Sequence, residues 1–328
     1  MKIASYLPQT TFTNADFERE FPDWNASKIE EKVGIRQRHI AAKDETALDM
    51  AFQAAEKVLA GEDRATVDFI LLCTQSPDYF LPTSACILQD RLGLRTQAGA
   101  LDYNLGCSGF IYGLALSKGL LAGGIATRVL LVMSETYSKH MHPGDRANRS
   151  IFGDGAAAVL LDPDDLPRIG TFELGTDGSG KNNLIVEAGA MRKSCIPGAA
   201  EIPSEDGTFH SPNYLYMNGP EIFNFTIDSV PGLVGSVLRK NNLTLDEIDY
   251  VIFHQANKYM LEYLRKKIRI PAEKYYNNML MTGNTVSATI PIALRDCLDT
   301  GRIAAGSKLL LVGFGVGYSW GAVVLTWQ

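Results

Sequence analysis

Three features that would assign the chain to a specialised class are missing from its 328 residues. No apolar run reaches the roughly 18 residues that a membrane span needs, and no charged start followed by a long apolar stretch marks an export signal. Lysines and arginines are scattered rather than massed, and the net charge is −6. The sequence therefore predicts a cytoplasmic protein with no membrane partner and no nucleic-acid groove.

Cysteine is also scarce, with five residues and no C-x-x-C spacing, which argues against a disulfide framework and a structural zinc site. The loop that contains His140, His142 and Asp145 lacks a third well-spaced ligand, so we expect no metal there. The glycine-rich segment 175–181 ends in a lysine with no Ser or Thr after it and no clear helix, which excludes a P-loop.

Alternating strands and helices occupy the first part of the chain. Near-continuous apolar runs at 67–76 and 128–135 predict buried strands, and the helical spacing of apolar residues at 46–60 predicts an amphipathic helix. This alternation is typical of βαβ units with right-handed crossovers and predicts an α/β fold. We also expect Asn14 to cap the first helix and Pro231 to kink or interrupt a later one.

The second half of the sequence repeats the first. LDEIDYVIFHQAN echoes RATVDFILLCTQS, DCLDTGRIAAGSKLLLVGFG echoes SKGLLAGGIATRVLLVMSE, and GVGYSWGAVVL echoes FGDGAAAVLL. The chain is therefore predicted to be a pseudo-duplicate of two related α/β halves, residues 1–165 and 166–328. Residues at matching strand ends should then meet near a shared pseudo-twofold axis.

The stretch 100–109 holds the first candidate for chemistry, because an apolar run stops at Cys107 and small residues then open a long apolar segment. This pattern predicts a strand, a tight turn and a buried helix, with the thiol near a helix N-terminus that favours the thiolate. A buried, inert cysteine is the alternative. His254 and Asn284 lie at comparable strand ends; taken singly, they fit a satisfied core histidine and a turn residue equally well.

Five segments in order carry a resemblance to a known family: the Cys107 turn, FGDGA from Phe152, HQAN from His254, GNT from Gly283 and GFGVGYSWG near the C-terminus. With them, the whole chain resembles the β-ketoacyl-acyl carrier protein synthase III family of thiolase-fold condensing enzymes. The resemblance implies two pseudo-duplicated halves in an α-β-α-β-α layered arrangement.

The resemblance also implies a decarboxylative Claisen condensation of an acyl-CoA primer with malonyl-acyl carrier protein. Cys107 would hold the acyl group, Nε2 of His254 and the amide of Asn284 would bind the enolate oxygen, and backbone N–H groups of Cys107 and Val316 would form the oxyanion hole. No permanently bound cofactor is implied. An acyltransferase that passes the acyl group to an amine or hydroxyl is the alternative; a non-catalytic partner subunit would not need the nucleophile.

Only some of the family's residues that contact coenzyme A and the carrier protein have a match in this sequence. Trp24 and Arg146 match the pair that sandwiches the adenine, although Trp24 also fits a surface-packing role. Lys266 and Lys267 match basic residues that meet the carrier protein; a solvated helix face is the alternative. Two further basic docking positions of the family are occupied here by Asn224 and Tyr259.

Two departures from the family bear on the acyl pocket. Leu81 stands where a Phe reaches across the family's homodimer to cap the pocket of the neighbouring subunit. Val316 replaces the middle glycine of the usual turn, where a positive φ would strain a β-branched residue.

Overall fold

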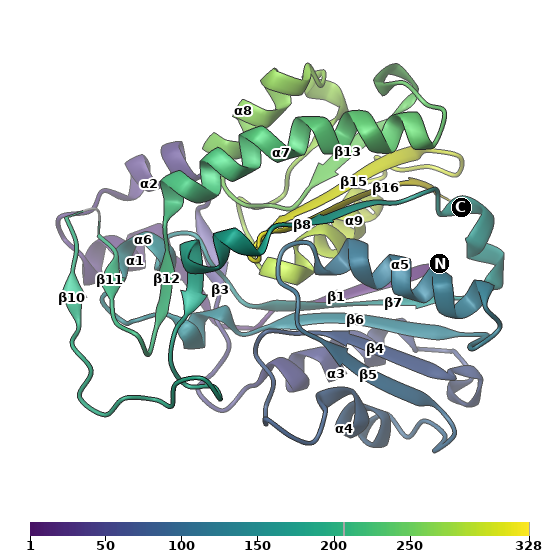
Figure 1. Ribbon diagram of the computed structural model, residues 1–328, viewed down its shortest axis with the longest axis horizontal. Coiled ribbons are helices and arrows are strands. Elements are labelled where there is room, and N and C mark those ends of the chain that lie inside the picture. Colours follow the sequence, from purple (N-terminus) through teal and green to yellow (C-terminus); the bar gives the residue numbers. More distant parts are fainter. Residues whose placement is uncertain (206, 328) are drawn as a thin grey trace.

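The computed structural model describes residues 1–205 and 207–327, which form five layers (Figure 1). Helices α3 (Ala47–Val58) and α4 (Ser84–Arg91) cover the outer face of one five-stranded sheet, and α7 (Gly219–Lys240) and α8 (Lys258–Ile268) cover the outer face of a second. Helices α5 (Gly109–Ala122) and α9 (Thr289–Asp299) fill the space between the sheets. The predicted α-β-α-β-α fold is confirmed.

The two sheets share one topology. The first has the order β1 (Lys2–Tyr6), β7 (Gly155–Leu161), β6 (Val129–Glu135), β4 (Phe69–Cys73) and β5 (Gly99–Tyr103). The second has the order β8 (Glu173–Thr176), β16 (Ser319–Thr326), β15 (Lys308–Gly315), β13 (Tyr250–Phe253) and β14 (Tyr275–Tyr276). In each sheet the three strands at one end are parallel and the other two pair antiparallel.

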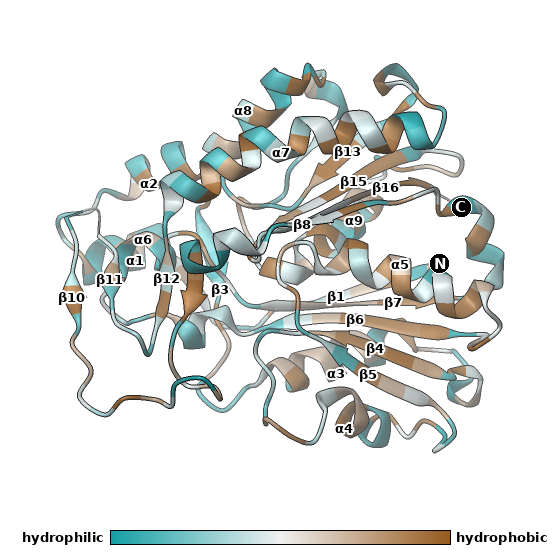
Figure 2. Ribbon diagram, in the orientation of Figure 1, coloured by the Kyte–Doolittle hydropathy of each residue, from teal (hydrophilic) through white to brown (hydrophobic). Residues whose placement is uncertain are grey.

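The central strands and helices have apolar sequences because other layers cover them on both sides. Every residue of β6 and of β7 is buried, since helices cover both faces of the first sheet, and an unbroken apolar run is what such strands require. Helix α5 contacts strands of both sheets and is apolar around much of its circumference. Figure 2 shows the hydrophobic residues concentrated on these central elements.

The remaining strands and helices lie at the left end of the molecule in Figure 1 or lead to it. They are β2 (Thr11–Thr13), α1 (Asn14–Glu20), α2 (Ala26–Val33), β3 (Gln37–His39), α6 (Arg146–Arg149), β9 (Leu184–Val186), β10 (Ile202–Pro203), β11 (Phe209–His210) and β12 (Leu215–Met217). Strand β12 pairs with β9, and β10 pairs with β11, so the excursion from the second sheet is a pair of short ribbons.

The predicted cap of the first helix is wrong, and the later helix is not interrupted at its proline. Thr13 rather than Asn14 caps α1, because the Thr13 and Asp16 side chains form a reciprocal capping box while Asn14 turns inward and donates to the Ile35 carbonyl. Pro231 lies inside α7, which continues to Lys240 without a break. Packing of α7 against β8, β15 and β16 outweighs the backbone hydrogen bond that the proline removes.

Within the part of the chain that the structure describes, no helix is both long enough and apolar enough to cross a membrane.

The close approach of α5 to its neighbours gives a test of the packing. A Cβ on Gly109 would lie 2.4 Å from Sγ of Cys73, so we expect Gly109→Ala to destabilise the fold by about 1–3 kcal/mol through overpacking. Gly119→Ala in the same helix is the matched control; no atom lies within 4 Å of its added Cβ, and it should be neutral or slightly stabilising. Urea unfolding midpoints measure both, and equal midpoints would contradict this packing.

Candidate active site

Cys107 lies in the short loop between β5 and α5, and Ser108 is the N-cap of the helix. The side chain of Cys107 is only 6% exposed. The backbone N–H groups of Val316 and of Cys107 itself lower the pKa of the thiol, and a Cβ on Gly315 would lie 2.7 Å from the sulfur. The end of β15 therefore meets the thiol, and only a glycine at position 315 leaves room for it.

The electrostatics of Cys107 differ from the prediction. A position near a helix N-terminus favours a thiolate, but burial raises the pKa of the Cys107 thiol to about 12. The two N–H donors lower the pKa, while the charge of Glu135 raises it further. Loss of solvent thus outweighs the helix terminus, and the thiol is protonated in the resting site.

His254 follows β13 directly and is fully enclosed. Its Nδ1 lies 2.7 Å from Oγ1 of Thr289, and its Nε2 lies 3.5 Å from Nδ2 of Asn284. Oδ1 of Asn284 accepts the Val286 N–H at 2.9 Å, which fixes the amide so that its nitrogen faces the histidine. The sequence motifs HQAN and GNT thus place an imidazole nitrogen and an amide nitrogen side by side.

Strand β15 joins these groups into one site. The ring of Phe314 packs edge-on against His254, with 5.8 Å between the ring centroids, and the next residue, Gly315, lies against Cys107. The backbone N–H of Val316, the next residue, lowers the pKa of the thiol. Cys107 thus follows β5 of the first sheet, and His254 and Val316 directly follow β13 and β15 of the second. Asn284 comes from the segment between β14 and α9.

The backbone strain expected at Val316 is found at Val286 instead. Val316 is not in the left-handed region, and Gly317, with φ 141°, takes the unusual conformation of that turn. Val286 instead has φ 56°, a costly value for a buried β-branched residue. Since the Val286 N–H orients the Asn284 amide, the strained residue directly shapes the site.

Sequence reasoning missed the polar groups that surround these residues. Glu135 ends β6, is fully buried and accepts the Ser287 hydroxyl at 2.8 Å. Tyr137 is also buried and donates to Oε1 of Gln75 at 2.8 Å. An acidic residue that directly follows a buried apolar strand was the available signal for Glu135.

Trp24 and Arg146, predicted to sandwich an adenine, are brought together. The Arg146 guanidinium lies 5.8 Å from the centre of a Trp24 ring, which is direct cation–π contact. Gly207 is packed on the same ring, since a Cβ there would lie 2.8 Å from it, and its carbonyl accepts the Arg146 N–H. A base could enter between the two side chains only if they moved apart.

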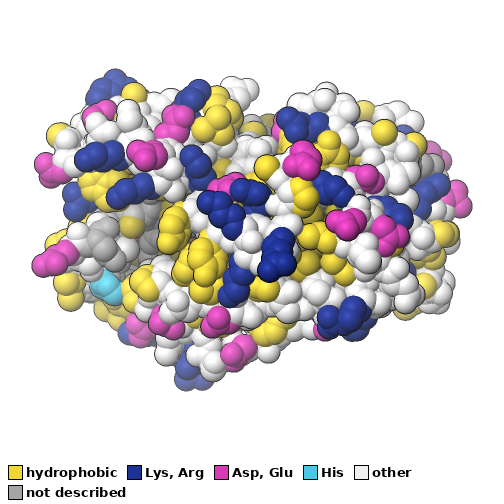
Figure 3. Space-filling model, turned by 90° about the horizontal axis from the view of Figure 1, so that it is seen from above, with side chains coloured by type: hydrophobic (Ala, Val, Ile, Leu, Met, Phe, Trp, Pro, Cys, Tyr) yellow, Lys and Arg dark blue, Asp and Glu magenta, His cyan; other side chains and the backbone are white. Residues whose placement is uncertain are grey.

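The predicted carrier-protein residues lie on α8. Lys266 is exposed, while Nζ of Lys267 donates to the Ile227 carbonyl of α7 at 2.7 Å. Tyr259 is 66% exposed and packs on Phe223, so an aromatic surface lies where the family has basic docking residues. Figure 3, which views the molecule from above, shows lysines and arginines interspersed with hydrophobic and acidic side chains.

The side chain of Leu81 is 81% exposed, and the side chains of its neighbours Tyr79 and Phe80 are exposed as well. The three side chains stand on the loop between β4 and α4, next to the edge strand β5.

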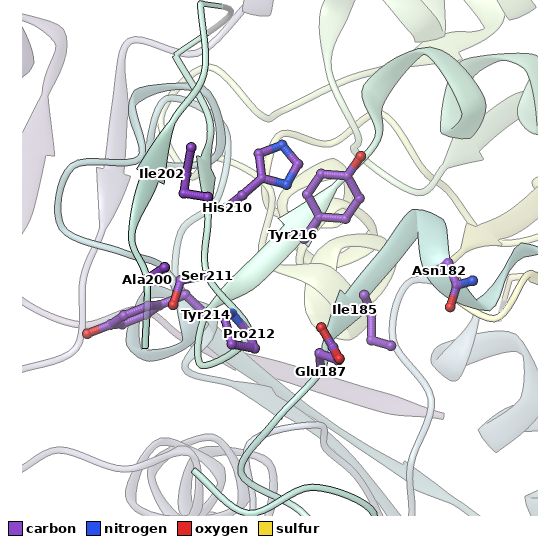
Figure 4. Close-up of a pocket in the computed structure, with 10 residues that line it drawn as sticks. All are labelled: Asn182, Ile185, Glu187, Ala200, Ile202, His210, Ser211, Pro212, Tyr214 and Tyr216. Atoms are coloured by element: carbon purple, nitrogen blue, oxygen red, sulfur yellow. The ribbon is translucent and has the colours of Figure 1, made fainter. Parts of the chain in front are cut away.

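A cavity of about 360 Å³ lies along the ribbon of β9 and β12 (Figure 4). Because side chains alternate along a strand, Ile185 and Tyr216 line the cavity while Leu184 and Leu215 point into the apolar cluster that contains Cys107. The cavity is therefore on the opposite face of the ribbon from the nucleophile. Among the described residues, no three His, Cys, Asp or Glu side chains are arranged to hold a metal ion.

Fold and site together define a thiolase-fold condensing enzyme. The family models for 3-oxoacyl-[acyl-carrier-protein] synthase III match residues 101–178 and, for its C-terminal part, 238–327. The β-ketoacyl-[acyl-carrier-protein] synthase III of Clostridium perfringens is 36% identical over 323 residues, 98% of this chain and 96% of the relative. The chain therefore belongs to the β-ketoacyl-acyl carrier protein synthase III family, as its motifs predict.

Solved structures agree with this assignment. A crystal structure of a 3-oxoacyl-(acyl-carrier-protein) synthase III is 48% identical, superposes with a TM-score of 0.96, and the match covers 99% of this chain and 98% of the other. The synthase III of Thermus thermophilus is 36% identical with a TM-score of 0.87, over 100% and 98% of the two chains. Members of this family are acyltransferases, so the chain is an enzyme of that class.

Burial of His254 predicts a pH effect on stability. Burial lowers the pKa of His254 to about 3, against about 6.5 in an unfolded chain. Between these values only the unfolded chain binds the proton, so this residue should reduce the free energy of unfolding by about 1.4 kcal/mol per pH unit as the pH falls below 6.5.

The pH effect is measured by urea unfolding at pH 7, 6 and 5. His254→Gln should lose stability less steeply than the wild type as the medium is acidified. His210→Gln, at an exposed position, is the matched control and should follow the wild type. Parallel curves for the wild type and His254→Gln would show that the imidazole is not held neutral.

Proposed function

We propose that the enzyme condenses an acyl-CoA primer with malonyl-acyl carrier protein, through an acyl group held on Cys107. The observation that carries this proposal is the pair of nitrogens of His254 and Asn284, 3.5 Å apart, together with the backbone N–H groups of Cys107 and Val316, which act on one thiol. Acyl transfer and enolate formation each need such a pair of donors.

The first half-reaction loads the primer. The sulfur of Cys107 attacks the thioester carbonyl, and the negative oxygen that develops is bound by the N–H groups of Cys107 and Val316. The carbonyl re-forms as the C–S bond to coenzyme A breaks, the thiol proton passes to the leaving sulfur, and free coenzyme A departs. Acyl-CoA is thus a substrate, and the scheme needs no permanently bound cofactor.

The second half-reaction uses His254 and Asn284. Loss of CO₂ from the malonyl thioester leaves an enolate, whose oxygen would accept hydrogen bonds from Nε2 of His254 and Nδ2 of Asn284. Nε2 can donate to the enolate in the tautomer that carries the imidazole hydrogen on this nitrogen. The enolate carbon attacks the acyl-Cys carbonyl, and the C–S bond breaks to give a β-ketoacyl thioester and the Cys107 thiolate. The thiolate takes up a proton from solvent, which restores the resting thiol.

Transfer of the acyl group to an amine or hydroxyl is the less favoured function. Such a reaction uses Cys107 and its oxyanion donors but gives no task to a second pair of donors. The paired nitrogens of His254 and Asn284 therefore favour condensation.

We place coenzyme A at Trp24 and Arg146 and the carrier protein at Lys266 and Lys267. A ring and a planar guanidinium suit an adenine base, and exposed ammonium groups suit an acidic carrier. The aromatic surface around Tyr259 supports a carrier that binds with less dependence on charge.

We further propose a homodimer in which Leu81 lines the neighbouring subunit's acyl pocket. The exposed apolar side chains of Tyr79, Phe80 and Leu81, beside an edge strand with open hydrogen-bonding groups, support it. The matched topology of the sheets supports two duplicated halves that meet near residue 165. A nucleophilic thiol must stay reduced, which supports a cytoplasmic location.

The two half-reactions can be separated by substitution. Asn284→Ala should still be acylated by acyl-CoA but lose a factor of about 10²–10³ in CO₂ release from carboxyl-labelled malonyl carrier protein, because one enolate donor is gone. Cys107→Ala should lose acylation altogether, and Asn277→Ala, at an exposed position of the same segment, should change neither.

Acylation is read by intact mass and CO₂ by its label. If the wild type releases no CO₂ from any malonyl thioester but acylates an added amine or alcohol, the condensing function is wrong and the acyltransferase takes its place.

The homodimer is tested by sedimentation equilibrium. We expect twice the 35.9 kDa of one chain, and we expect Phe80→Asp to shift the enzyme toward monomers because a charge replaces a side chain that is 74% exposed in the single chain. Tyr259→Asp, on α8 at the far side of the molecule, is the matched control. A stable, active monomeric wild type would refute the dimer.

A further inference from the structure

One buried carboxyl has no part in the scheme above. Glu135, the last residue of β6, is fully enclosed; Oε2 accepts the Gln75 N–H at 2.9 Å and the Ser76 hydroxyl at 3.4 Å, and Oε1 accepts the Ser287 hydroxyl at 2.8 Å. All three partners are neutral donors. Burial raises the pKa of Glu135 to about 8, so the carboxyl exchanges a proton in the working pH range.

The carboxyl lies beneath the start of α5. Gly109 is the first residue of the helix. If Gly109 carried a Cβ, that atom would lie 3.4 Å from Cβ of Ser287 and 2.4 Å from Sγ of Cys73, so both side chains pack against the first turn of α5. Glu135 is thus one side chain away from the helix turn that follows Cys107. A helix N-terminus stabilises one anion, while a second anion in the same dry region meets both desolvation and repulsion.

We propose that Glu135 is a positioning residue that controls the ionisation of Cys107: the start of α5 holds one negative charge, on the carboxylate or on the thiolate, and not on both. This inference rests on the proposed function only in taking Cys107 as the nucleophile. A protonated Glu135 permits the thiolate, and an ionised Glu135 opposes it, which agrees with the charge effect of Glu135 on the pKa of Cys107.

The other titratable groups around Glu135 stay neutral or reinforce the effect. Burial raises the pKa of Cys73, Tyr103 and Tyr137, which keeps all three protonated, and lowers the pKa of His140, which keeps it uncharged. Asp154, next to β7, accepts hydrogen bonds from Ser138 and Ala41, and its charge raises the pKa of Glu135. Glu135 and Cys107 are therefore the two groups near the start of α5 whose ionisations are coupled.

The sign of the pH effect follows from the order of ionisation. As the pH rises, Glu135 loses its proton near pH 8, before Cys107, and its charge then makes the thiol harder to ionise. Thiolate formation should therefore rise by less than tenfold per pH unit above pH 8. Glu135→Gln keeps the shape of the side chain and removes the charge, so the thiol should ionise more readily at alkaline pH.

The test is the rate at which iodoacetamide alkylates Cys107 in the full-length enzyme between pH 6 and 10, read by peptide mass. The exposed thiols of Cys86 and Cys195 react in the same sample and serve as internal references. Relative to them, Glu135→Gln should react about tenfold faster at Cys107 at pH 9, which corresponds to a pKa lower by one unit, and should lack the change of slope near pH 8.

Ser287→Ala supplies the second arm. It keeps the carboxyl but removes a donor that lowers the pKa of Glu135, so the change of slope should move to higher pH. If the alkylation rate of Cys107 depends on pH in both variants as it does in the wild type, the proposal is wrong. If Glu135→Gln does not fold, the proposal is wrong when the change of slope in Ser287→Ala stays at the pH of the wild type. Alkylation involves no acyl chemistry, so the result stands whether or not the enzyme releases CO₂ from malonyl thioesters.

Discussion

Exclusion of water from the space between the two sheets governs the chemistry of this enzyme. Burial raises the pKa of Cys107, lowers that of His254 and raises that of Glu135, so each group is held toward its uncharged form. In the proposed reaction, charge develops only as the reaction proceeds, on an oxygen that meets donors already in place. In a dry site such donors act more strongly than they would in water.

The residues that we propose as reactive could be identified from the sequence because the ends of apolar runs are visible in it. Cys107 and His254 each follow an apolar run, and Asn284 lies in the short turn motif GNT. The protonation of Cys107 could not be predicted in the same way. It depends on Gly315 and Val316, which enclose the thiol from a strand some two hundred residues away in the chain.

The errors of the sequence reading share a cause, which is tertiary packing. The carboxamide of Asn14 has an inward partner, so Thr13 takes the cap, and Pro231 is carried through a helix by the sheet beneath it. The backbone strain expected at Val316 is found at Val286, where a hydrogen bond to Asn284 holds it. Glu135 and Ser287 have no motif at all, and only the docking of one half on the other shows that they touch.

The central layer also determines how the chain folds. Helix α5 is built from the first part of the chain but packs on β15 and β16, and α9 is built from the second part but packs on β1 and β7. Each sheet therefore obtains part of its apolar cover from the other half, and neither half can hide its inner face alone. We therefore expect the entire chain to be the unit of folding and to unfold in a single cooperative transition, although its architecture is double.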